Sequence, residues 1–382
     1  MIFRTRIIAA ALFVLPQALI SAQAEPVTPA TTANCRDKIL GKISDLRHIS
    51  TPEGIEVLEP VQIGGTTQWI SIRGLNKANP VLLMIHGGPG SPTMATSWAF
   101  QKPWEDYFTV VQWDQRGVGK NYQGADHEAL ARTVTLERMV EDGEEMVAYL
   151  RQRLHKDKIV VLGFSWGTTI GTLVAQRHPE WLYAYVGVGQ GVNDKAEAYI
   201  YTRTLELAEK AGNAQAVTEL RALAPYPVAD GQEFLRKALA IRKWVRVFNG
   251  GWYGKADFNL YFSLPQWGPE YTQQDADNIE PGMQWAESAL AADLASANSD
   301  LEQIATHFEV PIIFMMGRYD LHTPYFSAKK YFDRIDAPRK RFITFERSSH
   351  FVMFEEPGRF LVTLVNEVLP LTGEAATFQQ VD

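Results

Sequence analysis

Apolar side chains recur along this chain in two spacings, which predict alternating strands and helices. Over residues 54–63 and 66–74 apolar and polar residues alternate, so we expect two half-buried strands joined as an antiparallel hairpin across Gly64 and Gly65. Longer apolar runs predict further strands, and an uninterrupted run indicates a strand that is buried on both faces. These runs are residues 80–86, 108–114, 158–164, 183–189, 310–317 and 340–345.

Between these strands the apolar spacing changes to that of an amphipathic helix. Residues 135–154 show it most clearly, because their apolar positions fall on one face of a helix. Residues 324–335 and 357–370 predict two later helices. Strands that alternate with helices predict an α/β fold, in which a mostly parallel sheet is covered by helices on both faces.

The alternation stops over residues 194–308. Helical patterns cover 195–212, 213–223 and 231–248, and an irregular aromatic stretch follows without a convincing strand. We therefore expect residues 194–308 to form a helical cap. The cap is inserted into a core that consists of residues 53–193 and 309–382.

The first 24 residues predict an export signal. Two arginines precede an apolar run over residues 7–20, and Ala22-Gln23-Ala24 fits a cleavage site with small residues. The run is shorter than the roughly 20 residues that a membrane span needs. We expect cleavage after Ala24, no stable membrane insertion afterwards, and a periplasmic or secreted protein. Residues 25–52 are expected to form a flexible lead-in.

Composition narrows the classes of partner. The 382 residues are 46% hydrophobic and carry a formal net charge of −7, a balance that can fill a sizeable core. The chain has no basic run, so nucleic acid is not an expected partner. Cys35 is the only cysteine, which excludes an internal disulfide and argues against a cysteine-driven mechanism. The sequence does not indicate an oligomeric state.

One serine stands at a corner between a predicted strand and a predicted helix, in Gly163-Phe164-Ser165-Trp166-Gly167. A serine hydroxyl needs a base to take its proton and open space in front of it for a carbonyl. A sharp strand-to-helix turn supplies that space, and the flanking glycines let the strand and helix approach closely. The segment therefore predicts a nucleophile elbow with Ser165 as the nucleophile.

The other members of such a site follow from chain order, acid first and histidine second. Asp320 comes directly after the predicted strand 310–317, and His350 lies in the loop after 340–345. Both positions lie beyond the carboxyl ends of strands, where open α/β sheets place their sites. His322 is the main competitor as the base. His86 adjoins a glycine-rich loop and is expected to orient that loop.

A developing negative charge on the substrate needs two N–H donors. We expect one from Trp166, directly after the nucleophile, and one from Gly88 in the loop "HGGPG". Glycine allows a close backbone approach. No metal motif occurs, and "GVGQG" lacks the third glycine of a dinucleotide loop. We therefore expect neither a metal nor a cofactor.

Five segments in order carry a resemblance: "HGGPG", "DQRGVG", "GFSWG", "GRYD" and "SSHF". Together they resemble the proline iminopeptidase group of α/β-hydrolases over residues 53–193 and 309–370. The resemblance implies an α/β-hydrolase fold, with Ser165, Asp320 and His350 as the catalytic triad and Gly88 and Trp166 at the oxyanion hole. It implies a supporting role near the site for Asp114 and Arg116.

The cap departs from that group. The family binds the free amino group of its substrate through cap glutamates, yet the corresponding segment here, residues 258–262, contains no acid. Glu197, Glu206 and Glu287 are the substitutes we consider, against solvated helix surface as the simpler interpretation. Cap aromatic residues are candidates for a substrate pocket, or for packing within the cap. They are Trp244, Trp252, Tyr253, Tyr261, Phe262 and Trp267.

We expect an exported serine hydrolase that cleaves an ester or amide through an acyl-enzyme. Its substrate would be a small ester, a lactone or a short peptide. An esterase is favoured, because it needs only an apolar pocket in the cap. One alternative is a proline iminopeptidase or other aminopeptidase, which needs a buried carboxylate there. The other is a hydrolase-like binding protein without activity.

Overall fold

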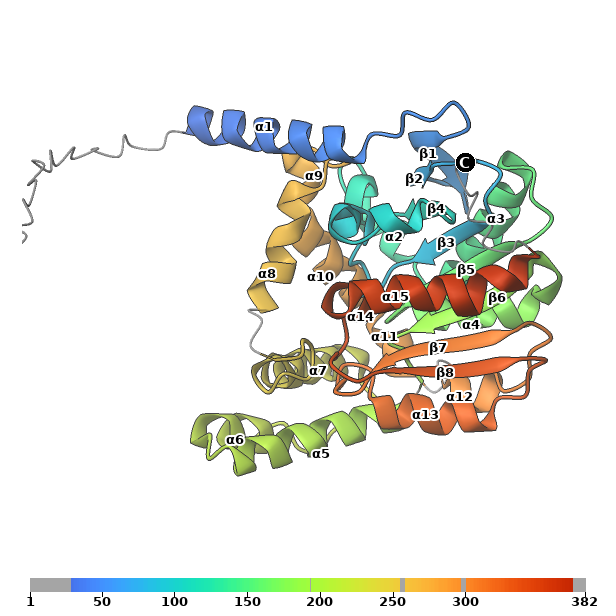
Figure 1. The fold of residues 1–382 in the computed structure, drawn as a ribbon. Coiled ribbons are helices and arrows are strands. Elements are labelled where there is room, and N and C mark those ends of the chain that lie inside the picture. Colours follow the sequence, from blue (N-terminus) through green and yellow to red (C-terminus); the bar gives the residue numbers. More distant parts are fainter. Residues whose placement is uncertain (1–28, 193, 255–257, 297–299, 374–382) are drawn as a thin grey trace, which may run out of the picture.

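An eight-stranded sheet forms the centre of the molecule (Figure 1). The structure is a computed structural model that describes residues 29–192, 194–254, 258–296 and 300–373. The strand order is β1-β2-β4-β3-β5-β6-β7-β8. The strands are β1 (Ile55–Ile63), β2 (Thr66–Gly74), β3 (Val81–Ile85), β4 (Thr109–Trp113), β5 (Ile159–Phe164), β6 (Leu182–Val188), β7 (Ile312–Gly317) and β8 (Lys340–Phe345).

The expected hairpin opens the sheet. β1 pairs with β2 in antiparallel register from Ile55 opposite Gly74 to Ile63 opposite Thr66. Gly64 and Gly65 form the turn with φ of +56° and +72°, a conformation that glycine adopts without steric cost. β2 pairs with β4 in antiparallel register, and every later pairing is parallel. The expected α/β fold is confirmed.

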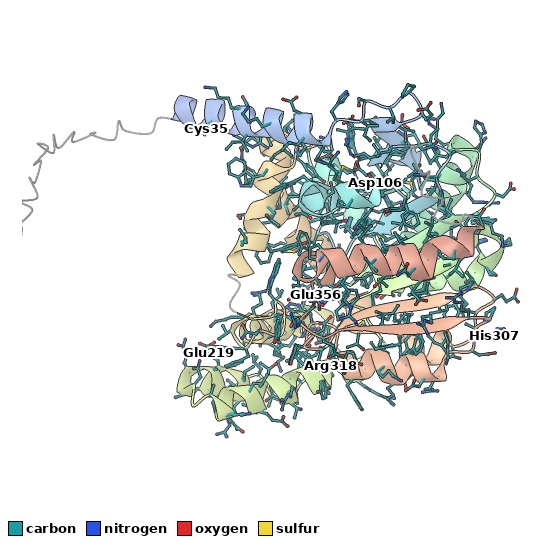
Figure 2. The ribbon with its side chains drawn as sticks, in the orientation of Figure 1. Cys35, Asp106, Glu219, His307, Arg318 and Glu356 are labelled. Atoms are coloured by element: carbon teal, nitrogen blue, oxygen red, sulfur yellow. The ribbon has the colours of Figure 1, made fainter. Side chains whose placement is uncertain are left out.

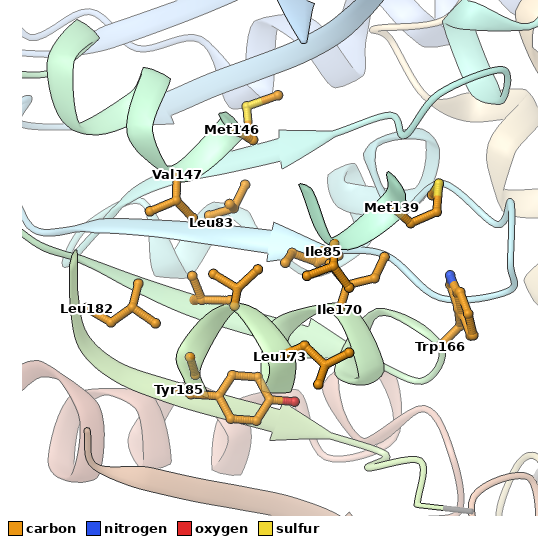
Figure 3. Packing of buried hydrophobic residues seen from close by; sticks show 14 of the residues in the cluster. Leu83, Ile85, Met139, Met146, Val147, Trp166, Ile170, Leu173, Leu182 and Tyr185 are labelled. Carbon is orange, nitrogen blue, oxygen red and sulfur yellow. The ribbon is translucent and has the colours of Figure 1, made fainter. Parts of the chain in front are cut away.

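Two apolar layers cover the two faces of the sheet. In β3, Leu83 and Ile85 pack with α3 (Leu136–Arg153), α4 (Gly167–Arg177) and α13 (Tyr325–Arg334), as Figure 3 shows for part of this cluster. Leu82 and Met84 of the same strand pack on the other face, against α15 (Pro357–Thr363). All four residues are fully buried, and each such side chain contributes about 1.5–3 kcal/mol to stability.

Between β6 and β7 the described residues contain helices and no strand. In Figure 1 most of these helices lie to the left of the sheet, toward which the arrowheads of β3 and β6 point, whereas the last of them, Leu301–Ile304, lies below β8 near α13. Part of this region has its own apolar cluster, centred on Ile200, Leu220, Ile241 and Val245. We call it the cap. Its helices are α5 (Asp194–Lys210), α6 (Ala214–Arg221), α7 (Gly231–Val247), α8 (Phe258–Ser263), α9 (Gln273–Asp277), α10 (Ile279–Ala289), α11 (Ala291–Leu294) and α12 (Leu301–Ile304).

The N-terminal segment differs from the expected flexible lead-in, because Pro29–Arg47 forms helix α1. Its amphipathic pattern is weak, and arginines attach it to the rest of the molecule instead. Arg36 donates to the carbonyls of Gln266 and Tyr271, and Arg47 pairs with Glu270 at 2.7 Å. Cys35 is exposed on this helix (Figure 2). The expected signal and its cleavage site lie outside the described residues.

The other described elements are α2 (His127–Ala131), α14 (Val352–Glu355), several short 3-10 helices and a π-helical stretch over Leu364–Val368. Within the described ranges, no helix is both long enough and apolar enough to cross a lipid bilayer.

Candidate active site

Ser165 occupies a strained corner between β5 and α4. Its φ is +53°, a region that non-glycine residues enter rarely and mostly where the fold requires it. Its N–H donates to the carbonyl of Val188 at 2.9 Å. A Cβ on Gly163 would lie 2.6 Å from the carbonyl oxygen of Gly167, and one on Gly167 would lie 2.1 Å from that of Ile85. Both glycines are therefore needed for the strand, corner and helix to pack.

His350 and Asp320 meet at the carboxyl ends of β8 and β7. The Nδ1 atom of His350 lies 2.8 Å from Oδ2 of Asp320, and both side chains are buried. Thr323 Oγ1 donates to the same carboxylate oxygen, while the N–H groups of His322 and Thr323 donate to the other oxygen, each at 2.9 Å. A carboxylate held in this way places the imidazole proton on Nδ1, which leaves Nε2 as the basic nitrogen.

Ser165 and His350 line one cavity of about 320 Å³. The ring of Phe164, directly before the serine, lies 5.1 Å from the His350 ring between centroids. Among the described residues, no hydrogen bond joins the Ser165 hydroxyl to His350. Such contacts are often long before substrate binds. The structure thus brings together the three side chains that chain order had selected.

The glycine-rich loop lies directly against the corner. A Cβ on Gly87 would lie 2.8 Å from Cβ of Ser165, and Gly88 has a φ of +112°. Trp166 is the N-cap residue directly before α4, at the helix end where backbone N–H groups have no partner within the helix. Both proposed oxyanion donors, Gly88 and Trp166, line the cavity.

His86 holds that loop. Burial lowers the pKa of its imidazole to about 4, so the ring is neutral. Nε2 accepts the N–H of Gln115 at 3.2 Å, so Nδ1 carries the proton and donates to the carbonyl of Gly87 at 2.9 Å. The orienting role expected for His86 agrees with this geometry.

His322, the competitor for the role of base, also lines the cavity, and its ring stacks on His350 with 5.1 Å between centroids. Burial first, and then the charges of His350, Arg242 and Arg246, lower its pKa well below the usual value. Asp320 bonds the His322 backbone rather than its ring. The carboxylate therefore orients His350.

Asp114 and Arg116 directly follow β4, and neither is among the residues that line the cavity of Ser165. Arg116 forms a buried, two-pronged ion pair with Asp142, with both contacts at 2.7 Å. Asp114 accepts the hydroxyl of Tyr271 from the cap and the N–H of Lys120. Burial raises the pKa of Asp114 to about 7. The Tyr271 contact connects core and cap, while the Arg116–Asp142 pair lies within the core, and both fit a supporting role.

The cap aromatic residues separate into two groups. Tyr261 and Phe262 line the cavity, whereas four others are not among its lining residues: Trp244, Trp252, Tyr253 and Trp267. Trp244 faces the inside of the cap, where its Nε1 donates to Glu219. Trp252 stacks on Phe351 at 5.4 Å. For these two residues packing, rather than substrate contact, explains the aromatic side chain.

The three candidate cap carboxylates also differ in whether they line the cavity. Glu206 pairs with Arg203 on the exposed surface of α5. Glu197 and Glu287 both line the cavity. Glu197 is engaged in an ion pair with Arg242 and also accepts the hydroxyl of Tyr226. Glu287 makes no hydrogen bond or ion pair with any described residue, and burial raises its pKa to about 7 against the attraction of Arg246.

Sequence reasoning missed Glu355, which holds the loop that carries His350. Its carboxylate accepts the N–H groups of Ser349 and Phe351, on either side of the histidine, and that of Tyr253. Its neighbour Glu356, which Figure 2 labels, accepts the backbone N–H of Arg347 and the hydroxyl of Ser348 in the same loop. Only the folded chain shows these contacts, because nothing in the sequence ties the acids to backbone N–H groups.

Glu355→Gln should lower kcat by about 10- to 100-fold with little change in KM, because an amide keeps a single acceptor oxygen and the imidazole loses its alignment. Steady-state kinetics at pH 8 measure this effect. Glu346→Gln, at an exposed ion pair with Arg318, is the matched control. Equal kcat values for the two variants would contradict a positioning role for Glu355.

Comparisons with known proteins agree with this geometry. Residues 80–357 match the family described as alpha/beta hydrolase fold. A probable aminopeptidase of Bacillus subtilis (strain 168) is 30% identical over 321 residues, which cover 83% of this chain and 97% of that protein. A proline iminopeptidase of Heyndrickxia coagulans is 23% identical over 304 residues, covering 76% of this chain and 90% of the relative.

Among solved structures, a proline iminopeptidase-related protein of Thermus thermophilus superposes with a TM-score of 0.55 at 19% identity. The match covers 81% of this chain and 96% of that one, and at this identity it shows a shared fold. The resemblance expected from five short segments is thereby confirmed. The chain belongs to the alpha/beta hydrolase fold family and, within it, is similar to the proline iminopeptidases.

Proposed function

We propose that this chain is an exported serine aminopeptidase that releases the N-terminal residue of short peptides. The observation that carries the proposal is Glu287, a carboxyl group that lines the cavity of Ser165 without a hydrogen bond or ion pair to any described residue. An aminopeptidase must bind the ammonium group of its substrate, and a buried carboxylate does this strongly. Because of Glu287, we prefer an aminopeptidase to the esterase that the sequence favours.

In the proposed mechanism Ser165 attacks the scissile carbonyl while His350 takes the hydroxyl proton at Nε2. Asp320 holds the imidazole and stabilises its cation. The N–H groups of Gly88 and Trp166 bind the negative oxygen, and each such donor contributes about 3 kcal/mol. His350 then protonates the leaving nitrogen, the C–N bond breaks, and an acyl-enzyme remains. Water attacks it, gives its proton to His350, and Ser165 regains its hydroxyl.

Glu287→Gln should raise KM for alanine or proline p-nitroanilide by about 10- to 100-fold, because the substrate ammonium loses a charged partner. The KM of a p-nitrophenyl ester, which lacks the amino group, should stay within about twofold. Parallel kinetics on both substrates measure the difference. Glu206→Gln is the control, at an exposed carboxylate of the same cap. An equal effect of Glu287→Gln on both substrates would contradict an amino-group site.

The pH dependence should differ between the two substrates. As the pH falls through about 7, the Glu287 carboxyl takes up a proton and loses the charge that binds ammonium. Protonation of His350 affects both reactions, so the ratio of kcat/KM for p-nitroanilide to that for ester isolates Glu287. We expect this ratio to fall between pH 7 and pH 5.5, where the substrate amine stays protonated. A constant ratio would argue against the assignment.

Esterase activity is the second candidate, favoured by the apolar wall that α7 presents to the cavity through Phe234, Leu235 and Leu239. Efficient turnover of p-nitrophenyl esters with none of any amino acid p-nitroanilide would select it.

Export is part of the proposal. Cleavage after Ala24 would leave α1, which begins at Pro29, intact. N-terminal sequencing of protein from the periplasm or the medium should begin at Glu25. Protein that keeps Met1 and stays with the cytoplasm would contradict export.

A further inference from the structure

One face of α7 is divided between apolar and cationic residues. Phe234, Leu235, Ala238 and Leu239 line the cavity in its first part, and Arg242 and Arg246 line it toward the C-terminal end. These positions follow helical spacing, so they form a single stripe. We propose that Arg242 and Arg246 form a receptor for a substrate carboxylate, and that the preferred substrate is a free dipeptide. This inference rests on the proposed aminopeptidase function.

One N–H donor group of Arg242 has no acceptor among the described residues. Its Nη2 atom is paired with Glu197, which Tyr226 holds in turn through its hydroxyl. Its Nη1 atom is buried and has no hydrogen-bond partner among the described residues. A buried cationic donor without an acceptor is costly. A carboxylate in the cavity would satisfy it, and the fork of a guanidinium matches the two oxygens of a carboxylate.

Both arginines stand near the triad. Burial disfavours the charge on Arg242, but Glu197, Tyr226 and, more weakly, Asp320 raise its pKa overall. Burial and the charges of His350, Arg242 and Arg246 lower the pKa of His322, whose ring stacks on His350. The chain directly after α7 contacts the triad loops, because the carbonyls of Gly250 and Gly251 accept the N–H groups of Leu321 and His350. The cationic end of α7 is therefore the end nearer the reacting groups.

That position suits the carboxylate of a dipeptide. In a dipeptide the carboxylate carbon is separated from the scissile carbonyl carbon by only the amide nitrogen and one Cα. At neutral pH the same molecule carries an ammonium at its other end. A cavity lined by Glu287 and by the two arginines presents the opposite charges. A longer peptide, an amide or a neutral ester lacks the nearby carboxylate and leaves Arg242 Nη1 without an acceptor.

The test compares a dipeptide with its C-terminal amide, using the N-terminal residue that the p-nitroanilides favour. The wild-type protein should hydrolyse the free acid with a kcat/KM about 10- to 100-fold above that of the amide. Equal values would overturn the proposal on the wild-type protein alone, whatever the variants do. If no amino acid p-nitroanilide or dipeptide is hydrolysed, the proposed aminopeptidase function itself fails, which is a separate outcome.

Substitutions of Arg242 and Arg246 test whether these side chains cause the preference for the free acid. In Arg242→Gln and in Arg246→Gln the ratio of acid to amide should collapse toward one, and Arg242→Lys should keep part of it because the charge remains. Arg236→Gln is the matched control, since Arg236 lies on the same helix but is exposed and paired with Glu233. If Arg242→Gln does not fold, the ratio of acid to amide measured for Arg246→Gln tests the proposal. A ratio unchanged in Arg246→Gln and Arg242→Lys would place the carboxylate elsewhere.

Discussion

Ser165→Ala should reduce kcat/KM for every substrate by about 10⁴- to 10⁶-fold, because the attacking oxygen is removed while the binding groups remain. The loss should be the same for p-nitroanilides, esters and dipeptides. Substrate affinity, measured by binding of an unreactive analogue, should change little. The fold should persist, since the hydrogen bonds that Ser165 makes with described residues involve its backbone N–H and carbonyl groups.

The control for this variant is Ser263→Ala, which removes an exposed cap hydroxyl that donates to the nearby carbonyl of Leu260. It should retain full activity and the same thermal unfolding midpoint. Substantial hydrolysis by Ser165→Ala, above the background of a mock preparation, would show that another group attacks the substrate.

Asp320→Asn should lower kcat by about 10⁴-fold for a different reason. The N–H groups of His322 and Thr323 both donate to Oδ1, so the amide oxygen of asparagine would take that place. Its NH₂ group would then face Nδ1 of His350 and force the imidazole proton onto Nε2. The nitrogen that should accept the serine proton would already hold one.

Pre-steady-state kinetics and pH profiles measure this effect, and Asp333→Asn provides the control at an exposed ion pair with Lys329. A loss below about tenfold in Asp320→Asn would mean that Asp320 does not orient the base. His322 would then have to be tested in its place by His322→Gln.

Much of the core could be predicted because its signals are local. Uninterrupted apolar runs mark β3 and β5, and the glycine pair at 64–65 marks the hairpin turn. The corner at Ser165 needs glycine at positions 163 and 167. A side chain at 163 would collide with the backbone of Gly167, and one at 167 would collide with Ile85 in the adjacent strand. Chain order then sufficed to select Asp320 and His350, because parallel strands end at one edge of a sheet.

The cap could not be predicted to the same depth, because its chemistry depends on which side of each helix faces the core. Arg242 and Arg246 alternate with Trp244 along α7, a pattern that suggests a solvated polar face and a buried aromatic one. In the structure the arginines line the cavity and Trp244 packs within the cap. Glu287 gives no local sign of burial either. The helix α1 was missed because long-range contacts of arginines, not an apolar face, attach it.

The central claim is that Ser165 is the nucleophile of a functional triad with His350 and Asp320. Its most direct test is to treat the purified protein with a fluorophosphonate and to map the modified peptide by mass spectrometry. We predict one adduct, on Ser165, that forms rapidly in the wild type and is absent from Ser165→Ala. A wild-type protein that stays unmodified, or one modified at another residue, would contradict the claim.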